Sequence, residues 1–397
     1  MSKLQELIQR LCPDGVEYKK LGEICKVVNA PKKLNKKDYQ DIGLYPIIDQ
    51  GKSMIVGYTN DRDVLLPAKE YVLFGDHTRN IKYYNGTFAQ GADGLKILIS
   101  KDIVLTRFLY YSMQCLTIED RGYNRHWSVV SPLPVPVPPL EVQEEIVRIL
   151  DRFDVYAAEL QAELQARKEQ YEYYRNLLLT FNPAGCAGEA NDEQEGSVTT
   201  WGGHSYPIQW KTMGEIGKIK MCKRVMKNQT TDRGDIPFYK IGTFGKKADA
   251  FISRKIFDEY KRLYSYPRKG TILVSASGTI GRCIVYEGEE AYYQDSNIVW
   301  LDNDESIVLN TYLYHYYQIV NWNTEGGTIK RLYNDRFAST PIPIPPLELQ
   351  EKIVAILDRF ETLVNDLSEG LPAEIAAVKE QYEYYRNRLL TFKEKTA

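Results

Sequence analysis

Two long stretches of the chain repeat apolar residues at the spacing of a helix that packs along its whole length. From Leu150 to Phe181 apolar or aromatic residues occupy the a and d positions of a heptad repeat, with Arg167 as the exception. We call these a and d positions the seam, because they face the partner helix in a coiled coil. This period predicts a left-handed coiled coil. The seam positions are Leu150, Phe153, Ala157, Leu160, Leu164, Arg167, Tyr171, Tyr174, Leu178 and Phe181.

The second stretch begins the same pattern at Leu357 and then shifts by four residues after Glu-Gly-Leu-Pro (369–372). A four-residue insertion is a stutter, and Gly370 and Pro372 favour a kink or a short break at this point. The seam positions here are Leu357, Phe360, Val364, Leu367, Leu371, Ile375, Val378, Tyr382, Tyr385, Leu389 and Phe392.

Both stretches belong to an internal repeat. PVPPLEVQEEIVRILDRF (136–153) recurs as PIPPLELQEKIVAILDRF (343–360), and KEQYEYYRNLLLTF (168–181) recurs as KEQYEYYRNRLLTF (379–392). Each Pro-rich run must be extended, because Pro lacks a backbone donor and disfavours helix in the residue before it. The residues between the repeated segments are unrelated in the two halves. We call the repeated segments the frame and the unrelated stretches the two inserts.

Each insert is predicted to be an α+β domain. Runs rich in β-branched and aromatic residues, separated by Gly, Asn and Asp, indicate strands between residues 45 and 100 and between residues 236 and 301. The segments 103–115 and 311–320 have the composition of helices. A weaker echo of the frame, VEYKKLGEI (16–24) and IQWKTMGEI (208–216), opens the two halves. We expect an antiparallel or mixed sheet in each insert.

The predicted organisation is a pseudo-twofold repeat of five parts. They are a first block with a short N-terminal helix (1–139), a helical arm (140–181), a flexible linker rich in Gly, Ala and acidic residues (182–205), a second block (206–346) and a second arm (347–397). Because the partner arm lies in the same chain, we expect an antiparallel intramolecular coiled coil with one mixed α/β block at each end. A homodimeric coiled coil is the alternative.

Charge is distributed unevenly along the chain, whose formal net charge is −2. Residues 14–139 contain 17 Lys and Arg against 14 acidic residues, and residues 206–346 contain 20 against 15. The excess is modest, but it places the basic character in the two blocks rather than in the arms, which is the distribution expected of a DNA footprint there.

Loops that combine cations, small polar residues and aromatics are the candidates for DNA contact, because phosphates need Lys or Arg and base edges need Arg, Asn, Gln, Ser or Thr. The candidates in the first block are Lys32, Lys33, Lys36, His77, Thr78, Arg79, Asn124, Arg125 and His126. The candidates in the second block are Lys223, Arg224, Ser275, Ser277, Thr279, Lys330, Arg331 and Tyr333.

Arg125-His126-Trp127 and Arg331-Leu332-Tyr333 hold similar places just before the two Pro-rich runs, and they are the leading candidates. The alternative interpretation of each loop is a solvated charged surface. For SASGTIG (275–281) the alternative is a tight turn.

Catalytic motifs are missing from the sequence. It contains no Asp/Asn-Pro-Pro-aromatic tetrapeptide, no Gly-rich cofactor loop and no GxxxxGK[ST] loop. Glu-Tyr-Lys at 17–19 and 259–261 matches a nuclease Glu-x-Lys only as a chance three-residue pattern. Six scattered cysteines and four dispersed histidines argue against a metal site. The chain is therefore expected to be non-catalytic.

The sequence also predicts a cytoplasmic protein. No run of about 18 apolar residues could span a membrane, and MSKLQELIQRL at the N-terminus lacks the apolar core of a signal peptide. Scattered cysteines without CxxC spacing are typical of reduced thiols.

These features resemble the specificity subunit of type I restriction–modification enzymes over nearly the whole chain. The most specific parts are the two Pro-Pro-Leu-x-x-Gln-x-x-Ile-Val openings, the two KEQYEYYRN closings and the segment GTILVSASGTIG (270–281). The first block departs from the pattern, since GDHTRN (75–80) stands where the second block has SASGTIG.

The resemblance implies two target-recognition domains that read an asymmetric, bipartite sequence in double-stranded DNA. It also implies two modification subunits that dock on the helical regions and bring S-adenosylmethionine for adenine methylation. Restriction subunits would add translocation and cleavage driven by ATP and Mg. No cofactor is expected on this chain itself.

Two other functions compete with this interpretation. A self-contained DNA-modifying enzyme is opposed by the missing catalytic motifs. A cytoplasmic coiled-coil adaptor would bind protein partners through its blocks, and duplex binding that weakens steeply with salt would exclude it.

Overall fold

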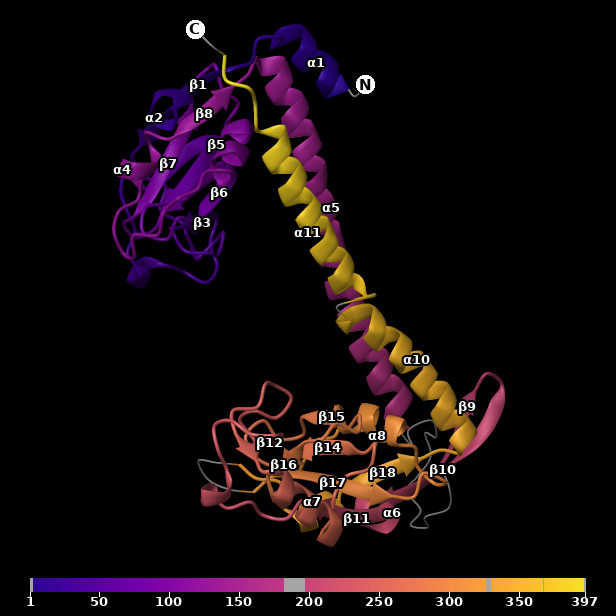
Figure 1. Cartoon of the computed structure of the whole chain (residues 1–397). Coiled ribbons are helices and arrows are strands. Elements are labelled where there is room, and N and C mark those ends of the chain that lie inside the picture. Colours follow the sequence, from indigo (N-terminus) through magenta and orange to yellow (C-terminus); the bar gives the residue numbers. More distant parts are fainter. Residues whose placement is uncertain (1–2, 182–196, 326–329, 367, 396–397) are drawn as a thin grey trace. The chain divides into compact units, whose positions relative to one another are not determined.

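The computed structural model describes residues 3–181, 197–325, 330–366 and 368–395 (Figure 1). The chain divides into two compact units, residues 1–162 with 373–397 and residues 163–372. The division falls inside helix α5 (Leu140–Leu179) and near the start of helix α11 (Leu371–Leu389). None of the helices in the described ranges is both long and apolar enough to cross a membrane.

The first unit contains a six-stranded mixed sheet in the order β2-β7-β5-β6-β3-β4, in which the β3–β6 pair is parallel and the other pairs are antiparallel. Its strands are β2 (Cys25–Val28), β3 (Tyr45–Ile48), β4 (Gly57–Thr59), β5 (Leu65–Gly75), β6 (Ile81–Gln90) and β7 (Leu95–Ser100). Its short helical elements are α1 (Lys3–Leu11), α2 (Leu21–Ile24), η1 (Lys36–Asp38), α3 (Thr106–Gln114) and α4 (Trp127–Val130). The predicted N-terminal helix and the helix expected at 103–115 are confirmed.

The last part of strand β5 (71–75) is buried on both faces. Val72 and Phe74 join the core formed with α3 and the start of α5, whereas Tyr71 and Leu73 join a separate core on the other face. This follows from the period of two along a strand, which sends neighbouring side chains to opposite faces. Helix α3 therefore has a hydrophobic surface of the sheet to pack on, and it is fixed to the strand that ends in the 75–80 loop.

In each unit the segment that opens the half, VEYKKLGEI (16–24) or IQWKTMGEI (208–216), pairs with the Pro-rich run of the same unit. Strand β1 (Glu17–Lys20) is antiparallel to β8 (Pro134–Val137), with Lys20 opposite Pro134. Strand β10 (His204–Thr212) pairs with β18 (Pro341–Ile344) in the same way, with Thr212 opposite Pro341. The Pro-rich runs are extended, as predicted. The sequence did not predict that each run pairs with another strand. Proline is tolerated because it lies on edge strands, where no ladder donor is needed on the free side.

The second unit builds its block from small sheets. A four-stranded antiparallel sheet has the order β11-β17-β14-β15, and a three-stranded sheet has the order β13-β12-β16, with β12 and β16 parallel. These strands are β11 (Gly217–Met221), β12 (Ile236–Tyr239), β13 (Phe251–Ile252), β14 (Ile272–Ser275), β15 (Cys283–Val285), β16 (Tyr292–Tyr293) and β17 (Ile298–Asn303). The helical elements are α6 (Met213–Ile216), η2 (Lys227–Gln229), α7 (Arg254–Leu263), α8 (Asn310–Tyr317) and α9 (Asn334–Ala338).

The predicted linker needs correction. Residues 182–196 lie outside the described residues, but residues 197–205 are not a linker. They form β9 (Ser197–Trp201) and the start of β10, which pair as a hairpin across Gly202 and Gly203. Both glycines have positive φ (56° and 82°), the conformation that a tight two-residue hairpin turn requires. The β-branched residues of Ser-Val-Thr-Thr-Trp favour the strand.

Long helices pair within each unit (Figure 1). In the first unit the ring of Phe153 on α5 lies 5.7 Å from that of Tyr385 on α11, and Tyr156 donates a hydrogen bond to Glu374 at 2.6 Å. In the second unit Tyr174 of α5 stacks on Phe360 of α10 (Leu347–Asn365) at 5.6 Å. Positions later in α5 thus contact positions earlier in its partner, which is the order of an antiparallel pair.

The second arm breaks between α10 and α11, which confirms the predicted interruption. The break begins at Asp366, before Gly370, because the Asp366 carboxylate accepts the backbone N–H groups of Ser368 and Glu369 and so ends the helix. A Cβ on Gly370 would lie 2.5 Å from the carbonyl oxygen of Thr362, so only glycine fits. The seam position at Leu367 lies outside the described residues.

Candidate nucleic-acid interface

In the first block, Asp76 ties together the two candidate loops. It follows β5 directly, and its Oδ1 accepts the N–H of Trp127 at 2.7 Å. Its carbonyl oxygen accepts hydrogen bonds from the backbone N–H and from Nδ1 of His126, at 2.8 and 2.9 Å. The Nε2 atom of His126 accepts the N–H of Arg121 at 3.2 Å. The loops 75–80 and 121–127 therefore form one surface.

The second block has the same junction with different side chains. Leu332 donates its backbone N–H to the carbonyl oxygen of Ala276 at 2.9 Å, as His126 does to Asp76. Ala276 directly follows the central strand β14. The prediction that Arg125-His126-Trp127 and Arg331-Leu332-Tyr333 hold similar places is confirmed, because the middle residue of each triplet makes the equivalent backbone bond.

Two of the predicted contact residues are buried, and their assignment as direct DNA contacts is wrong in this structure. His126 is 0% exposed, and both ring nitrogens are used within the protein. Ser275 is 1% exposed; its hydroxyl donates to the carbonyl of Thr279 and accepts the N–H of Arg282 at 2.9 Å. Both side chains hold a loop in place, because a buried polar group must be satisfied internally.

Lysine and amide groups gather beside the 75–80 loop. Lys33 forms an ion pair with Asp93, and this hydrogen bond and charge hold the pKa of Asp93 below its usual value. Gln50 donates to the carbonyl of Asp93 at 3.0 Å, and its own carbonyl accepts the hydroxyl of Thr78. Gln50 was not predicted from the sequence. Lys32 and Lys36 are exposed on the same segment as Lys33, so a row of cations lies beside the surface.

An exposed aromatic platform lies on the same surface. The ring of Tyr123 is 82% exposed and stacks on His77 at 4.6 Å, with 12° between the planes. Asn124 is exposed and bonds the carbonyl of Arg121, and Arg125 is exposed beside it. Exposed polar side chains and cations beside this ring suit contacts with the phosphates of a duplex. Tyr123 lies within the loop RGYNRHW (121–127), whose composition makes it a candidate, but the sequence did not single out this residue.

Arg79 is engaged inside the first block. It adopts a left-handed backbone conformation (φ 60°) and binds Asp120 at 2.7 Å and the carbonyl of Ile118 at 3.3 Å. The Gly122 N–H and the Arg79 charge lower the pKa of Asp120. Arg79 therefore orders the 118–122 segment, which directly precedes Tyr123.

In the second block Arg331 reaches into a turn. Its Nη2 donates to the carbonyl and the hydroxyl oxygens of Ser296, at 3.0 and 2.9 Å, and lies 3.3 Å from Oδ1 of Asn297. Ser296 has a left-handed backbone (φ 51°). This turn lines a pocket of about 500 Å³ whose other polar residues include Arg224, Lys227, Lys240 and Gln294.

The remaining candidates of the second block surround this pocket or the neighbouring loop. Arg224 pairs with Asp295 at 2.8 Å, and Lys223 lies 4.9 Å from the centre of the Tyr264 ring. Thr279 and Tyr333 are exposed, and Ser277 forms a β-bridge with Arg331. Lys330 is exposed, and the four residues before it (326–329) lie outside the described ones. A second pocket of about 220 Å³ opens at Thr279, Arg282 and Lys246.

Comparisons with known proteins agree with this arrangement of two blocks on one frame. The sequence model of the family described as the type I restriction modification DNA specificity domain matches residues 13–169 and 207–377. A putative type I restriction enzyme specificity subunit of Haemophilus influenzae is 42% identical over 398 residues, covering 95% of this chain and 96% of that protein. The EcoR124I/EcoR124II specificity subunit of Escherichia coli is 31% identical over 425 residues, covering 99% and 98%.

Solved structures share the fold at low sequence identity. The S subunit of a type I restriction–modification system from M. genitalium matches with a TM-score of 0.53 and 13% identity, over 95% of this chain and 96% of that chain. A chain from a structural study of the assembly and conformational transition of a type I system matches with a TM-score of 0.55 and 16% identity, over 95% and 98%. The chain belongs to the family of type I restriction–modification specificity subunits.

Proposed function

We propose that each block of this chain reads one half of a bipartite, asymmetric target in double-stranded DNA, and that the helices set the spacer between the halves. The observation that carries this proposal is the shared loop junction with unlike side chains. The same backbone positions hold Asp76, Arg125 and His126 in the first block. In the second block they hold Ala276, Arg331 and Leu332. Because base recognition depends on the side chains that face the DNA, two blocks with different side chains at equivalent positions would read two different DNA sequences.

The long helices support the proposed role as a spacer. Their seam contacts run in antiparallel order in both units, as an intramolecular coiled coil with pseudo-twofold symmetry requires. A coiled coil resists bending because side chains interlock along its length. Residues 140–181 and 347–397 would therefore fix the separation of the half-sites.

The arms also offer an equivalent docking surface in each unit. Tyr173 and Tyr384 occupy the same place in the two KEQYEYYRN segments, and their side chains are 63% and 57% exposed. Exposed aromatics on a polar helix are typical anchors of protein interfaces. We assign these surfaces to two modification subunits, one per segment. Those subunits would bring S-adenosylmethionine, and restriction subunits would use ATP and Mg; this chain would bind no cofactor itself.

Replacing the first block tests the proposal. Residues 14–139 contain both β1 and β8, so a swap for the block of a relative keeps the pair of strands that closes the frame. The methylated sequence in a host that carries the chain with its modification partner should change in one half-site only. A swap of residues 206–346 is the matched control and should change only the other half. If either swap altered both halves, independent reading would be wrong.

A further inference from the structure

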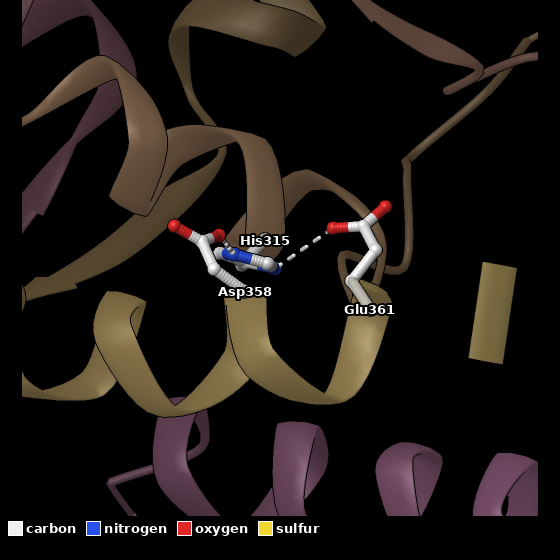
Figure 2. Close-up of side chains that lie close together, drawn as sticks. All are labelled: His315, Asp358 and Glu361. Carbon is white, nitrogen blue, oxygen red and sulfur yellow. Dashed lines mark hydrogen bonds and ion pairs between the residues drawn. The ribbon is translucent and has the colours of Figure 1, made fainter. Parts of the chain in front are cut away.

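In the second unit one buried histidine joins the recognition block to the arm helix. His315 on α8 is 0% exposed, and its Nε2 lies 2.7 Å from Oδ1 of Asp358 on α10. Its Nδ1 lies 3.9 Å from Oε2 of Glu361, one turn further along α10. Figure 2 shows the two carboxylates at opposite edges of the ring. One ligand atom of each residue lies within 4.8 Å of the others. Each carboxylate nevertheless faces a different ring nitrogen, so the two acids hold the ring from both sides.

Other side chains fix these partners. The Tyr314 hydroxyl donates to Oε1 of Glu361 at 2.6 Å, and the Tyr171 hydroxyl of α5 lies 3.5 Å from Nδ1 of His315. Arg175 lies over the Tyr171 ring and donates to Gln318. The orientation of the imidazole is thus determined by two arm helices and not by α8 alone.

The first unit has the same arrangement at the same positions of the repeat. The Tyr111 hydroxyl on α3 lies 2.6 Å from Oδ1 of Asp151 and 2.7 Å from Oδ2 of Asp154, both on α5. Arg107 adds hydrogen bonds to both carboxylates at 2.7 and 2.9 Å. Burial raises the pKa of Asp154, and the bond from Tyr111 and the charge of Arg107 oppose that rise.

The equivalence of these positions follows from a second pair of contacts. Gln143 accepts the N–H of Leu105, and Gln350 accepts the N–H of Leu309, both at 2.9 Å. Tyr111 follows Leu105 by the same number of residues as His315 follows Leu309. Asp151 and Asp358 likewise stand at equal distances in sequence after the two glutamines. By this register, Thr311 replaces Arg107.

We propose that Tyr111 and His315 are positioning residues that fix the angle of each recognition block on its arm and thereby restrict the spacer length that the complex accepts. The inference rests on the proposed function. Apart from the glutamine and the apolar core, the polar contacts of this helix with its arm converge on the same pair of carboxylates, which Arg107 also binds in the first unit and Tyr314 in the second. The contacts of Tyr111 or His315 with the arm carboxylates lie about two helical turns beyond the glutamine contact. We call them the clamp, because a second polar contact stops the helix from pivoting about the glutamine.

The clamp is linked to the reading loops through packed residues. Helix α3 shares a core with Phe74 of β5, and Asp76 follows that strand and holds the 121–127 loop. Helix α8 shares a core with Val274 of β14 and with Ala276, which holds Leu332. A rotation of either helix would therefore move the loop that faces DNA without changing the side chains that read bases.

The test measures methylation by the complex of the full chain with its modification partner on a DNA library in which the spacer varies and both half-sites are constant. His315→Ala should lower the preference for the native spacer over one longer or shorter by a base pair by about tenfold, since a hydrogen bond to a charged group is lost. The preferred bases of both half-sites should stay unchanged. The double variant His315→Tyr with Thr311→Arg installs the residues of the first unit and should restore the preference.

The matched control is Tyr316→Phe, which removes a hydrogen bond from the same helix to the carbonyl of Pro341 and not to an arm helix. It should keep the native spacer preference. Equal loss of activity at every spacer in His315→Ala, or a broadened spacer in Tyr316→Phe, would overturn the inference. If the wild-type complex recognised no bipartite site, the proposed function itself would fail; an unchanged spacer preference in His315→Ala defeats only the clamp.

Discussion

The side-chain amide of Gln350 holds the backbone of Leu309 against the start of α10. Its Oε1 accepts the N–H of Leu309 at 2.9 Å, and its Nε2 donates to the carbonyls of Ile307 and Pro345 at 2.9 and 2.8 Å. Gln143 makes the same three bonds in the first unit, to Leu105, Ile103 and Pro138. Both glutamines are 0% exposed. The Gln of each Pro-Pro-Leu-x-x-Gln motif is therefore the joint between loop, Pro-rich strand and arm.

Replacing this joint should loosen one unit. Gln350→Leu leaves one N–H and two carbonyls without partners in the core, which should cost about 2–4 kcal/mol. Hydrogen exchange of the amides around Leu309 should accelerate by at least about 30-fold, while those around Leu105 stay protected. Gln165→Leu, which removes an exposed bond to Glu169, is the control and should change neither. Unaltered exchange at Leu309 would contradict the structural role of the motif.

The arginines of the two loop triplets should read separate halves of the target. Arg125→Ala or Arg331→Ala should weaken binding by about 1–3 kcal/mol, and only for sequences that keep the cognate base if the guanidinium reads a guanine edge. A phosphate contact would instead weaken all sequences alike. Ser296→Ala is the control for Arg331, since it removes an internal partner and keeps the guanidinium. Affinity measured on duplexes substituted in one half-site checks this, and unchanged binding in both variants would remove these loops from the interface.

Acid should weaken the ion pairs that Glu145 of α5 makes with Arg148 and with Lys3 of the N-terminal helix. Glu145 is 4% exposed at its side chain; the hydrogen bond from Arg148 and, to a smaller extent, that from Lys3 lower its pKa to about 2. A depressed pKa stabilises the folded state above the ordinary value of 4.5, and this contribution disappears as the pH falls toward 2. The melting temperature of wild type should exceed that of Glu145→Gln at neutral pH, with a gap that shrinks below pH 4.5.

The control for this titration is Glu141→Gln, which breaks only an exposed pair with Arg10. Its effect on melting should be small at every pH, because solvent screens exposed pairs. A gap between wild type and Glu145→Gln that persisted undiminished at acid pH would show that charge is not its origin.

The exposed tyrosines of the arms should each hold one partner. Tyr173→Glu or Tyr384→Glu places a charge in an apolar contact and should reduce the complex from two modification subunits per chain to one. The double variant should retain neither. Tyr123→Glu changes a more exposed tyrosine, which lies in the first block, and should keep both subunits. Native mass spectrometry of the purified complexes gives the stoichiometry, and two subunits retained by the double variant would refute the assignment.

The frame could be predicted from the sequence because it is written twice. The repeated segments predicted the two helical arms. The four extra residues of the second copy predicted the break between α10 and α11. The pairing of β1 with β8 was not predictable in this way, since a Pro-rich run looks unsuited to a strand until a partner edge is known. Helix α7 was likewise missed, although Ser253 caps it by accepting the N–H of Ile256.

The candidate interface was only partly predictable. Loop composition made Lys33, Arg125 and Arg331 candidates, because charge and polarity can be recognised in sequence, and these three stay predictions. Burial cannot, so His126 and Ser275 were assigned to the surface although they hold the loops from inside. Gln50 was missed, and Tyr123 was not singled out within its candidate loop (121–127), because their contacts come from residues distant in the sequence, Asp93 and His77.

The most direct test of the account lengthens the first arm by one AELQ unit after Gln165, within α5, where AELQ already occurs twice (158–165). Four helical residues add about 6 Å and turn the helix by about 400°, so the seam face is roughly kept. With about 3.4 Å per base pair, methylation mapping of a host carrying this variant and its partner should find the spacer longer by about one or two base pairs and both half-sites unchanged. A spacer of unaltered length would contradict the claim that the arms set the distance between two independent readers.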